Sequence, residues 1–167
     1  MEKTGIFYSF RSIKTAQQVK KIAKLLGSES ELVDVDIATA KDFMKFRNYI
    51  LAVPTWFDGE LPSYWDEFLP SIEEEGLKGK QFAIFGGGDQ KGYPENFVDG
   101  IGLMAKFIES EGGKIVGLTS TKGYTFESSQ AQRGDQFLGL ALDIENQAAL
   151  SNERIEKWVE SLKKEFK

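Results

Sequence analysis

Residues 48–65 read NYILAVPTWFDGELPSYW, a short apolar run followed at once by a loop that carries an aromatic side chain. The apolar run at 48–53 has the length and composition of a buried β-strand. Residues 82–97 repeat the arrangement as FAIFGGGDQKGYPENF, a strand-like run and then a loop with Tyr93. Because open α/β sheets bind ligands at the carboxyl ends of their strands, we expect Trp56 and Tyr93 to be placed to clamp a flat ring.

The rest of the chain alternates short apolar runs with segments of helical period. Strands are expected at residues 5–9, 32–35, 48–53, 82–86 and 115–118, with a further strand-like run at 139–142. Apolar residues recur at helical spacing between these runs, first at 16–26 and last at 155–166. Strands that alternate with helices form βαβ units with right-handed crossovers. The sequence therefore predicts a three-layer α/β fold with a five-stranded parallel sheet and helices on both of its faces.

Length and composition limit the functions that this chain can have. Its 167 residues suit a single domain over 1–167, and its net charge of -5 argues against nucleic-acid binding. The absence of cysteine and histidine excludes disulfides, thiolate metal sites and imidazole chemistry, so any chemistry must come from a cofactor. The sequence has neither a signal-like apolar segment nor an apolar run of membrane-spanning length. We therefore expect a cytoplasmic protein without a membrane partner.

One tract has no regular period. Residues 119–139 contain Tyr124, Phe126 and many polar side chains, and the strand-like run at 139–142 follows them. Long loops inside compact domains are uncommon and are often functional. The tract is expected to be an insertion in the fifth strand.

Three segments, in this order, resemble the long-chain type of the flavodoxin family. Residues 54–65 resemble the first flavin loop of that family, residues 85–102 resemble the second, and residues 123–147 resemble the inserted loop that defines long-chain members. The resemblance covers nearly the whole chain. Flavodoxins are themselves a standard example of FMN bound where the strand order of a parallel sheet reverses.

This resemblance implies a fold and a function. The fold is a flavodoxin-like three-layer sandwich with strand order 2-1-3-4-5 and a long loop inserted in strand five. The function is that of a low-potential carrier of single electrons, which binds FMN noncovalently and is not an enzyme with a substrate of its own. Its expected partners are a flavodoxin or ferredoxin reductase and redox acceptor enzymes, and it is expected to be a monomer.

Three loops supply the residues expected to bind FMN. They are Ser9, Phe10, Arg11, Ser12, Ile13, Lys14 and Thr15; Pro54, Thr55, Trp56, Phe57, Asp58 and Gly59; and Gly87, Gly88, Asp89, Tyr93 and Asn96. Stacking of a flat ring on an aromatic side chain contributes about 0.5–1.5 kcal/mol beyond the burial of its area. Asp89 and Asn96 carry acceptors and donors for the pyrimidine edge of a flavin, although both residue types also favour turns for backbone reasons. Trp56 and Tyr93, in turn, could be ordinary aromatics of tight turns.

The loop after the first strand departs from the family. Flavodoxins usually have a loop resembling S/T-x-T-G-x-T that cradles the FMN phosphate at a helix N-terminus, whereas residues 9–15 here read SFRSIKT. Ser12 and Thr15 keep two hydroxyls, but Phe10 replaces a hydroxyl and Ile13 stands where glycine is expected. A β-branched residue resists a positive φ angle and close backbone approach. The departure affects the expected affinity for FMN rather than the expected fold.

Two positive charges in the same loop could compensate for these changes. Arg11 and Lys14 carry groups that bind phosphate well. As lone cations of a surface loop, they could equally be solvated charges.

Acidic residues are concentrated in one stretch without any lysine or arginine. Between residues 54 and 75 the seven acids are Asp58, Glu60, Asp66, Glu67, Glu73, Glu74 and Glu75. We expect this stretch to flank the flavin edge and to steer basic partners into transient, salt-sensitive complexes. The solvated face of a helix would explain the same residues.

Two other functions remain open on the sequence. One is a flavodoxin-like binding or regulatory module with weakened FMN binding, and the other is a small FMN-dependent reductase. The intact aromatic loops argue against the first. No second nucleotide site supports the other, because the glycines at 86–88 follow the fourth strand and lack GxGxxG spacing.

Overall fold

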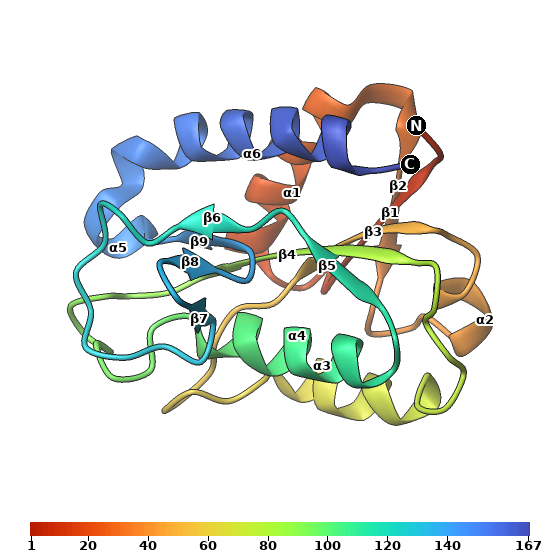
Figure 1. The fold of residues 1–167 in the computed structure, drawn as a ribbon, viewed down its shortest axis with the longest axis horizontal. Coiled ribbons are helices and arrows are strands. Elements are labelled where there is room, and N and C mark those ends of the chain that lie inside the picture. Colours follow the sequence, from red (N-terminus) through yellow and green to blue (C-terminus); the bar gives the residue numbers. More distant parts are fainter.

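The computed structural model describes residues 1–167, and at its centre lies a parallel β-sheet with helices on both faces (Figure 1). Its strands are β1 (Thr4–Tyr8), β2 (Ser30–Asp34), β3 (Asn48–Ala52), β4 (Gln81–Gly87), β5 (Lys114–Val116) and β9 (Leu140–Leu142). They are ordered β2-β1-β3-β4-β5, and β9 also pairs with β4. The predicted fold class and strand order are confirmed.

The fifth strand is divided into two halves. Residues Gln81–Ala83 of β4 pair with β5, and residues Phe85–Gly87 of the same strand pair with β9. The chain between the two halves forms β6 (Thr119–Ser120), β7 (Gln132–Arg133) and β8 (Gln136–Phe137), an antiparallel sheet in the order β6-β8-β7. The predicted insertion in strand five is confirmed, but it is not without structure. Strands of two residues are too short to leave a period in the sequence.

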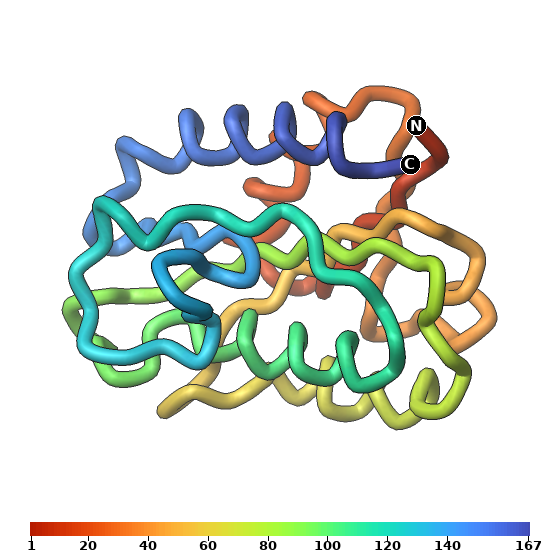
Figure 2. The backbone as a smooth tube through the Cα atoms, in the orientation of Figure 1, coloured from red at the N-terminus to blue at the C-terminus, as the bar shows by residue number.

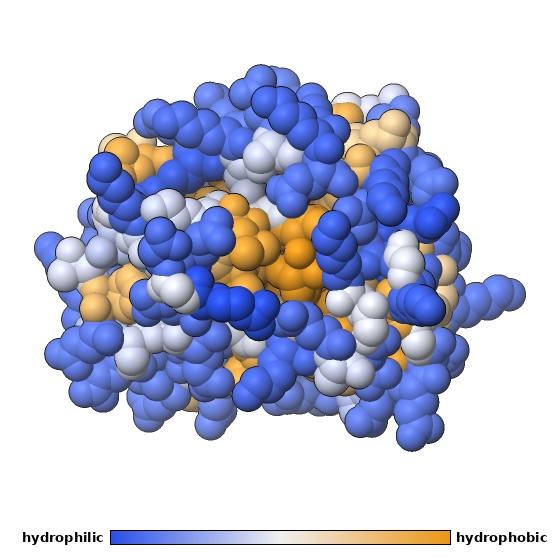
Figure 3. All heavy atoms as spheres, in the orientation of Figure 1, coloured by the Kyte–Doolittle hydropathy of each residue, from blue (hydrophilic) through white to orange (hydrophobic).

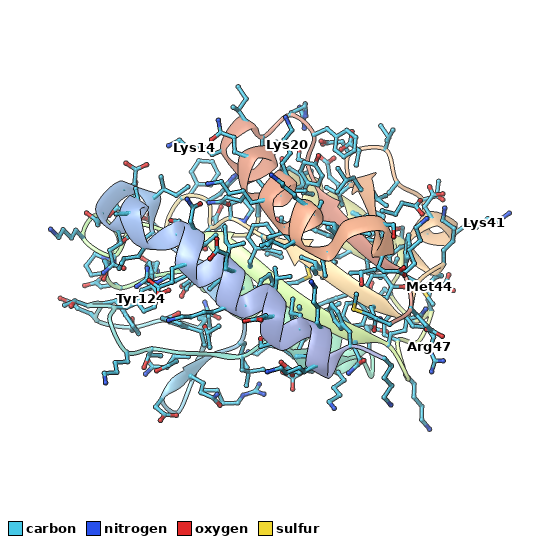
Figure 4. All side chains as sticks on the ribbon, turned by 90° about the horizontal axis from the view of Figure 1, so that it is seen from above. Lys14, Lys20, Lys41, Met44, Arg47 and Tyr124 are labelled. Carbon is cyan, nitrogen blue, oxygen red and sulfur yellow. The ribbon has the colours of Figure 1, made fainter.

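Helices cover the two faces of the sheet. They are α1 (Ile13–Leu26), α2 (Ala40–Phe43), α3 (Ser63–Phe68), α4 (Asp99–Ser110), α5 (Ile144–Gln147) and α6 (Ser151–Glu165), with short 3₁₀ turns η1 (Gly27–Glu29), η2 (Leu69–Ser71) and η3 (Ala148–Leu150). Helices α1 and α6 lie side by side on one face, while α3 and α4 lie on the other (Figures 1 and 4). These helices leave the carboxyl edge of the sheet to the loops.

The central strands are apolar throughout because both of their faces are buried. In β3, Ile50 packs in the core beneath α1 and α6, and the next residue, Leu51, packs in the core beneath α3 and α4. Such strands read as continuous apolar runs rather than as alternating ones. Each core also contains a buried tryptophan whose indole donates to a backbone carbonyl, Trp65 to Ala52 at 2.9 Å and Trp158 to Gly117 at 2.8 Å.

The two ends of the chain meet at the amino edge of the sheet (Figure 2). The backbone N–H of Glu2 donates to the carbonyl of Lys167 at 2.7 Å, and the side-chain amide of Asn48, the first residue of β3, donates to the same carbonyl at 2.9 Å. The opposite, carboxyl edge is therefore free of both termini.

The surface seen in this orientation is mostly hydrophilic, with a hydrophobic area near its centre between α6 and α4 (Figure 3). Several large hydrophobic side chains that are exposed lie instead at the carboxyl edge of the sheet: Phe10, Phe57 and Tyr93 in loops, and Ile13 at the start of α1. No helix combines the length and the apolar character that a membrane span requires.

Candidate functional site

A cleft of about 340 Å³ lies at the carboxyl edge of the sheet, between the segments that follow β1, β3, β4 and β9. It brings together most of the residues predicted from the sequence to bind the cofactor. These are Ser12, Lys14, Thr15, Pro54, Thr55, Trp56, Gly87, Gly88, Asp89 and Tyr93. The cleft therefore joins the start of a helix at one end to two aromatic loops at the other.

A smaller hollow of about 110 Å³ adjoins this cleft and shares four lining residues with it. Two further predicted residues, Phe57 and Asn96, line this hollow. The remaining predicted residues line neither cavity: Ser9, Phe10, Arg11, Ile13, Asp58 and Gly59.

Trp56 and Tyr93 are both partly exposed at the cleft. The indole of Trp56 packs edge-on against Tyr64, with ring centres 5.7 Å apart and an angle of 86° between the ring planes. Tyr93 is 51% exposed, and its backbone N–H donates to the carbonyl of Asp89 at 2.9 Å. Two aromatic surfaces are thus held at the site and are available to a flat, apolar ligand.

The loop that carries Trp56 is a closed turn. The backbone N–H of Trp56 donates to the carbonyl of Glu60, and the N–H of Glu60 donates back to the carbonyl of Trp56, each at 2.8 Å. Inside the turn Phe57 has a φ of 49° and Gly59 has a φ of 98°. A Cβ atom on Gly59 would lie 2.6 Å from a carboxylate oxygen of Asp99, so only glycine fits there. The turn fixes Trp56 and leaves the side chain of Phe57 in solvent, at 74% exposure.

The other end of the cleft is the beginning of α1. Ser12 is the N-cap residue, and its side chain makes no capping hydrogen bond. The first N–H groups of a helix have no acceptor within the helix, and they carry the positive end of its dipole. Thr15 adds a hydroxyl, and the ammonium of Lys14 lies 3.1 Å from the carboxylate of Glu145 on the far side of the cleft. This end is suited to an anion such as a phosphate group.

Ile13 does not distort this loop. It is the first residue of α1, it has no positive φ, and its side chain is 76% exposed. The conformation that glycine favours is therefore not needed at this position, and the expected resistance of a β-branched residue does not arise.

Arg11 and Ser9 are directed to Asp36 rather than into the cleft. The guanidinium of Arg11 donates to one carboxylate oxygen of Asp36 at 2.7 Å, and the hydroxyl of Ser9 donates to the other at 2.5 Å. The hydrogen bond from Arg11 is the main reason that the pKa of Asp36 is lowered. Phe10 packs its ring against Tyr8, with ring centres 4.8 Å apart. Of the two cations that could compensate for the changes at Phe10 and Ile13, only Lys14 lines the cleft.

Asp89 shapes the second aromatic loop. Its Oδ1 accepts hydrogen bonds from the backbone N–H of Gly92 at 2.8 Å, from that of Lys91 at 3.1 Å, and from the side-chain amide of Asn146 at 2.8 Å. The bond from Gly92 is the largest cause of its lowered pKa. Of the two roles considered for this carboxylate, the structure shows the turn-forming one. The side-chain amide of Asn96 lies 3.5 Å from the carboxylate of Asp99.

Four residues of the cleft were missed by sequence reasoning: Gln18, Leu142, Ile144 and Glu145. The last three lie at or just after the end of β9, so the rule that ligands bind at strand ends would have found them if it had been applied to the second half of strand five. Gln18 follows Lys14 by one helical turn and shares its helix face.

The acidic residues between 54 and 75 do not all lie at the carboxyl edge of the sheet. All seven are exposed, and none is in an ion pair. Asp58 and Glu60 flank Trp56, but the backbone N–H of Glu74 donates to the side chain of Glu111, directly after α4 at the opposite edge of the sheet. The expectation that the whole stretch flanks the site was wrong for residues 73–75, because α3 runs back along the sheet.

Comparisons with known proteins agree on one family. The family model described as Flavodoxin matches residues 11–158. A flavodoxin of Trichodesmium erythraeum is 42% identical over 170 residues, covering 99% of each chain, and one of Synechocystis sp. is 39% identical over 165 residues, covering 98% of this chain and 97% of the relative. The crystal structure of Fusobacterium nucleatum flavodoxin bound to flavin mononucleotide superposes with a TM-score of 0.94 at 36% identity, over the full length of both chains.

Proposed function

This chain belongs to the flavodoxin family, and on that premise we propose that it holds FMN noncovalently in the cleft at the carboxyl edge and carries single electrons between redox proteins. It is an electron-transfer protein and turns over no substrate of its own. When bound, FMN supplies the one-electron chemistry that a chain without cysteine and histidine lacks. The observation that carries the proposal is one cleft that joins Trp56 and Tyr93 to the start of α1.

The residues at the aromatic end fit the flavin ring. Trp56 and Tyr93 offer partly exposed rings, and Thr55 and Gly88 line both the cleft and the adjoining hollow. We assign the ring to this end, with residues 54–59, 87–89, 93 and 96 around it. These side chains exclude water from the ring and orient it by stacking.

The residues at the helix end fit a phosphate. The free hydroxyl of Ser12, the hydroxyl of Thr15 and the first N–H groups of α1 are donors suited to phosphate oxygens. Lys14 would exchange the carboxylate of Glu145 for the phosphate. Arg11 and Ser9 support this loop indirectly, since both hold it to Asp36.

Negative charges near the cleft favour a low reduction potential. Asp58 lies in the turn after Trp56, and Asp89 and Glu145 line the cleft. Carboxylates and partly buried aromatic walls make an added negative charge at the site costly. We therefore assign the protein to the low-potential carriers.

The partners are proposed to be a flavodoxin or ferredoxin reductase and acceptor enzymes, which dock at the same edge. Asp58, Glu60 and Glu67 are exposed there and unpaired, and the charge of Glu67 acts on Arg11, which supports its place beside the first loop. A single-sign surface steers basic partners to fast, salt-sensitive encounters. The carrier is proposed to work as a cytoplasmic monomer.

Electron shuttling can be tested with three components. An NADPH-dependent flavodoxin reductase is mixed with cytochrome c as acceptor, and the FMN-loaded protein is added in increasing amounts. The expected result is cytochrome reduction whose rate rises with the loaded protein and not with the FMN-free protein. If the loaded protein oxidised NADPH directly, without the reductase, it would be a reductase and not a carrier.

A further inference from the structure

We propose that Asp143 is a positioning residue for the flavin ring, and that it acts by fixing the first residues of the loop that carries Tyr93. It acts through Gln90, the second residue of that loop segment. The inference rests on the proposed FMN site. Neither Asp143 nor Gln90 was predicted from the sequence, and neither lines the cleft itself. The inference also gives the inserted segment a role, because the same network reaches that segment.

Asp143 is a fully buried carboxylate at the end of β9. It is 0% exposed and directly follows Leu142, the last residue of the strand. Its Oδ2 accepts hydrogen bonds from the backbone N–H of Gln90 at 3.1 Å and from the side-chain amide of Gln90 at 2.6 Å. Its Oδ1 accepts from the backbone N–H of Asn146 at 3.0 Å. A buried charge is tolerated only when donors surround it in this way.

Gln90 connects this carboxylate to the inserted segment. Its side chain is almost fully buried, and while its amide nitrogen donates to Asp143, its amide oxygen accepts from the backbone N–H of Thr125 at 2.6 Å. A hollow of about 570 Å³ lies beside this contact and is lined by both residues. The insert and the loop are joined here by this hydrogen bond, and further along by bonds from the backbone N–H groups of Glu127 and Ser128 to the carbonyl of Pro94.

Asn146 provides a second tie to the same loop. Its side-chain amide lies 2.9 Å from Asp143 Oδ2 and donates to Asp89 Oδ1 at 2.8 Å. Asp89 in turn accepts the backbone N–H of Tyr93 at its carbonyl. The segment from Asp89 to Tyr93 contains no helix or strand, so hydrogen bonds position it. The bonds from Gln90 and Asn146 hold its start, while bonds from the insert to the carbonyl of Pro94 hold the chain just after Tyr93.

Two variants test the role of this network. Asp143→Asn keeps the size of the side chain but turns an amide N–H group toward the donors of Gln90 or Asn146. Gln90→Met keeps the length of the side chain but removes both of its hydrogen bonds, to Asp143 and to Thr125. Each is expected to weaken the binding of FMN and of riboflavin alike, by about tenfold, because each removes buried hydrogen bonds that hold the loop of Tyr93. The visible circular dichroism of bound FMN is expected to change in both variants.

Tyr49→Phe is the matched control. The hydroxyl of Tyr49 is buried and donates to the carbonyl of Phe43 at 2.6 Å and to that of Phe46 at 3.0 Å, near the amino end of β3 and away from the cleft. The control removes a buried polar contact of comparable kind, so it is expected to lower the stability of the FMN-free protein to urea while the affinity for both flavins stays within about twofold. Urea unfolding of all three FMN-free variants shows whether each one folds.

The outcomes separate the inference from the proposed function. If wild-type protein binds FMN and the two network variants keep its affinity and its dichroism, the inference is wrong and the carrier function stands. If Asp143→Asn does not fold, the comparison of Gln90→Met with the control decides in the same way. If FMN-free wild-type protein binds neither flavin, the proposed function fails and the inference fails with it. Selective loss of FMN affinity, with riboflavin unaffected, would place the effect at the phosphate end and would also overturn the inference.

Discussion

The ammonium of Lys14 lies 3.1 Å from the carboxylate of Glu145, across the cleft that we assign to FMN. Both side chains are exposed, so the pair contributes little to the stability of the fold. In the proposed complex, Glu145 and the phosphate group of FMN compete for the same cation. Binding of FMN must therefore break this pair or share it.

Glu145→Gln is expected to tighten FMN binding by about two- to fivefold, the range typical of exposed charges, because Lys14 is then free for the phosphate. Riboflavin has no phosphate, so its affinity is expected to stay the same. Fluorescence titration of the FMN-free variant with both flavins measures the ratio. Equal gains for the two flavins would show that Glu145 acts on the ring and not through Lys14.

Lys14→Met is expected to weaken FMN by about five- to tenfold and to leave riboflavin unchanged, because a charge-assisted contact to the phosphate is removed. Lys20→Met is the matched control, since Lys20 projects from the same helix and its loss changes the net charge equally (Figure 4). The same titration applies. A comparable loss of FMN affinity in Lys20→Met would show that the effect comes from net charge and not from a contact of Lys14 with the phosphate.

Ile13→Gly is expected to change FMN affinity by less than about twofold, because Ile13 already has a backbone conformation open to any residue and its side chain lies in solvent. The free energy of unfolding is expected to fall by up to about 1 kcal/mol, the cost of glycine in a helix. Calorimetric titration and urea unfolding measure the two quantities. A large gain in FMN affinity would mean that the side chain of Ile13 obstructs the phosphate site.

Acids near the cleft and acids at the far edge are expected to differ in their effect on partner docking. The triple variant Asp58→Asn, Glu60→Gln, Glu67→Gln should slow reduction by a basic reductase and flatten its dependence on salt. The control carries the same change of charge at the opposite edge: Glu73→Gln, Glu74→Gln, Glu75→Gln. Stopped-flow reduction at several salt concentrations compares them. Equal effects would assign the steering to net charge rather than to a docking surface.

Acid is expected to loosen the two loops that depend on Asp36 and Asp89. Hydrogen bonds lower the pKa of both carboxyls below the ordinary value of 3.8, so the folded state takes up these protons less readily than the unfolded state. The stabilisation is complete above that value and is lost as pH falls through the lower, folded-state pKa. Asp89→Asn should therefore lower stability at pH 6 and flatten its fall below about pH 4. Urea unfolding over this range measures both, and an unchanged pH profile would contradict the role given to Asp89.

The sequence was sufficient for the features that depend on local pattern. Residues 48–53 and 82–86 are apolar on both faces because helices cover both sides of β3 and β4, and strand ends that share one edge bring Trp56 and Tyr93 to one cleft. The apolar strands and the shared edge both follow from the alternation of strands and helices, which the periodicity of the sequence indicates.

Contacts between distant segments could not be read in the same way. Gln90 and Asp143 are 53 positions apart, and no period or motif links a glutamine of one loop to the end of a later strand. The side chain of Arg11 points to Asp36, which is 25 positions away and lies two residues after the end of the neighbouring strand β2. The two-residue strands of the insert owe their existence to pairing with each other, which single-sequence periodicity does not record.

The most direct test of the account is the titration of FMN-free wild-type protein with FMN and, in parallel, with riboflavin. We predict that FMN binds tightly, that its fluorescence is quenched by Trp56 and Tyr93, and that riboflavin binds more weakly because it lacks the group that the start of α1 receives. Failure to bind either flavin would contradict the assignment of the cleft, and equal affinity for both would contradict the phosphate site.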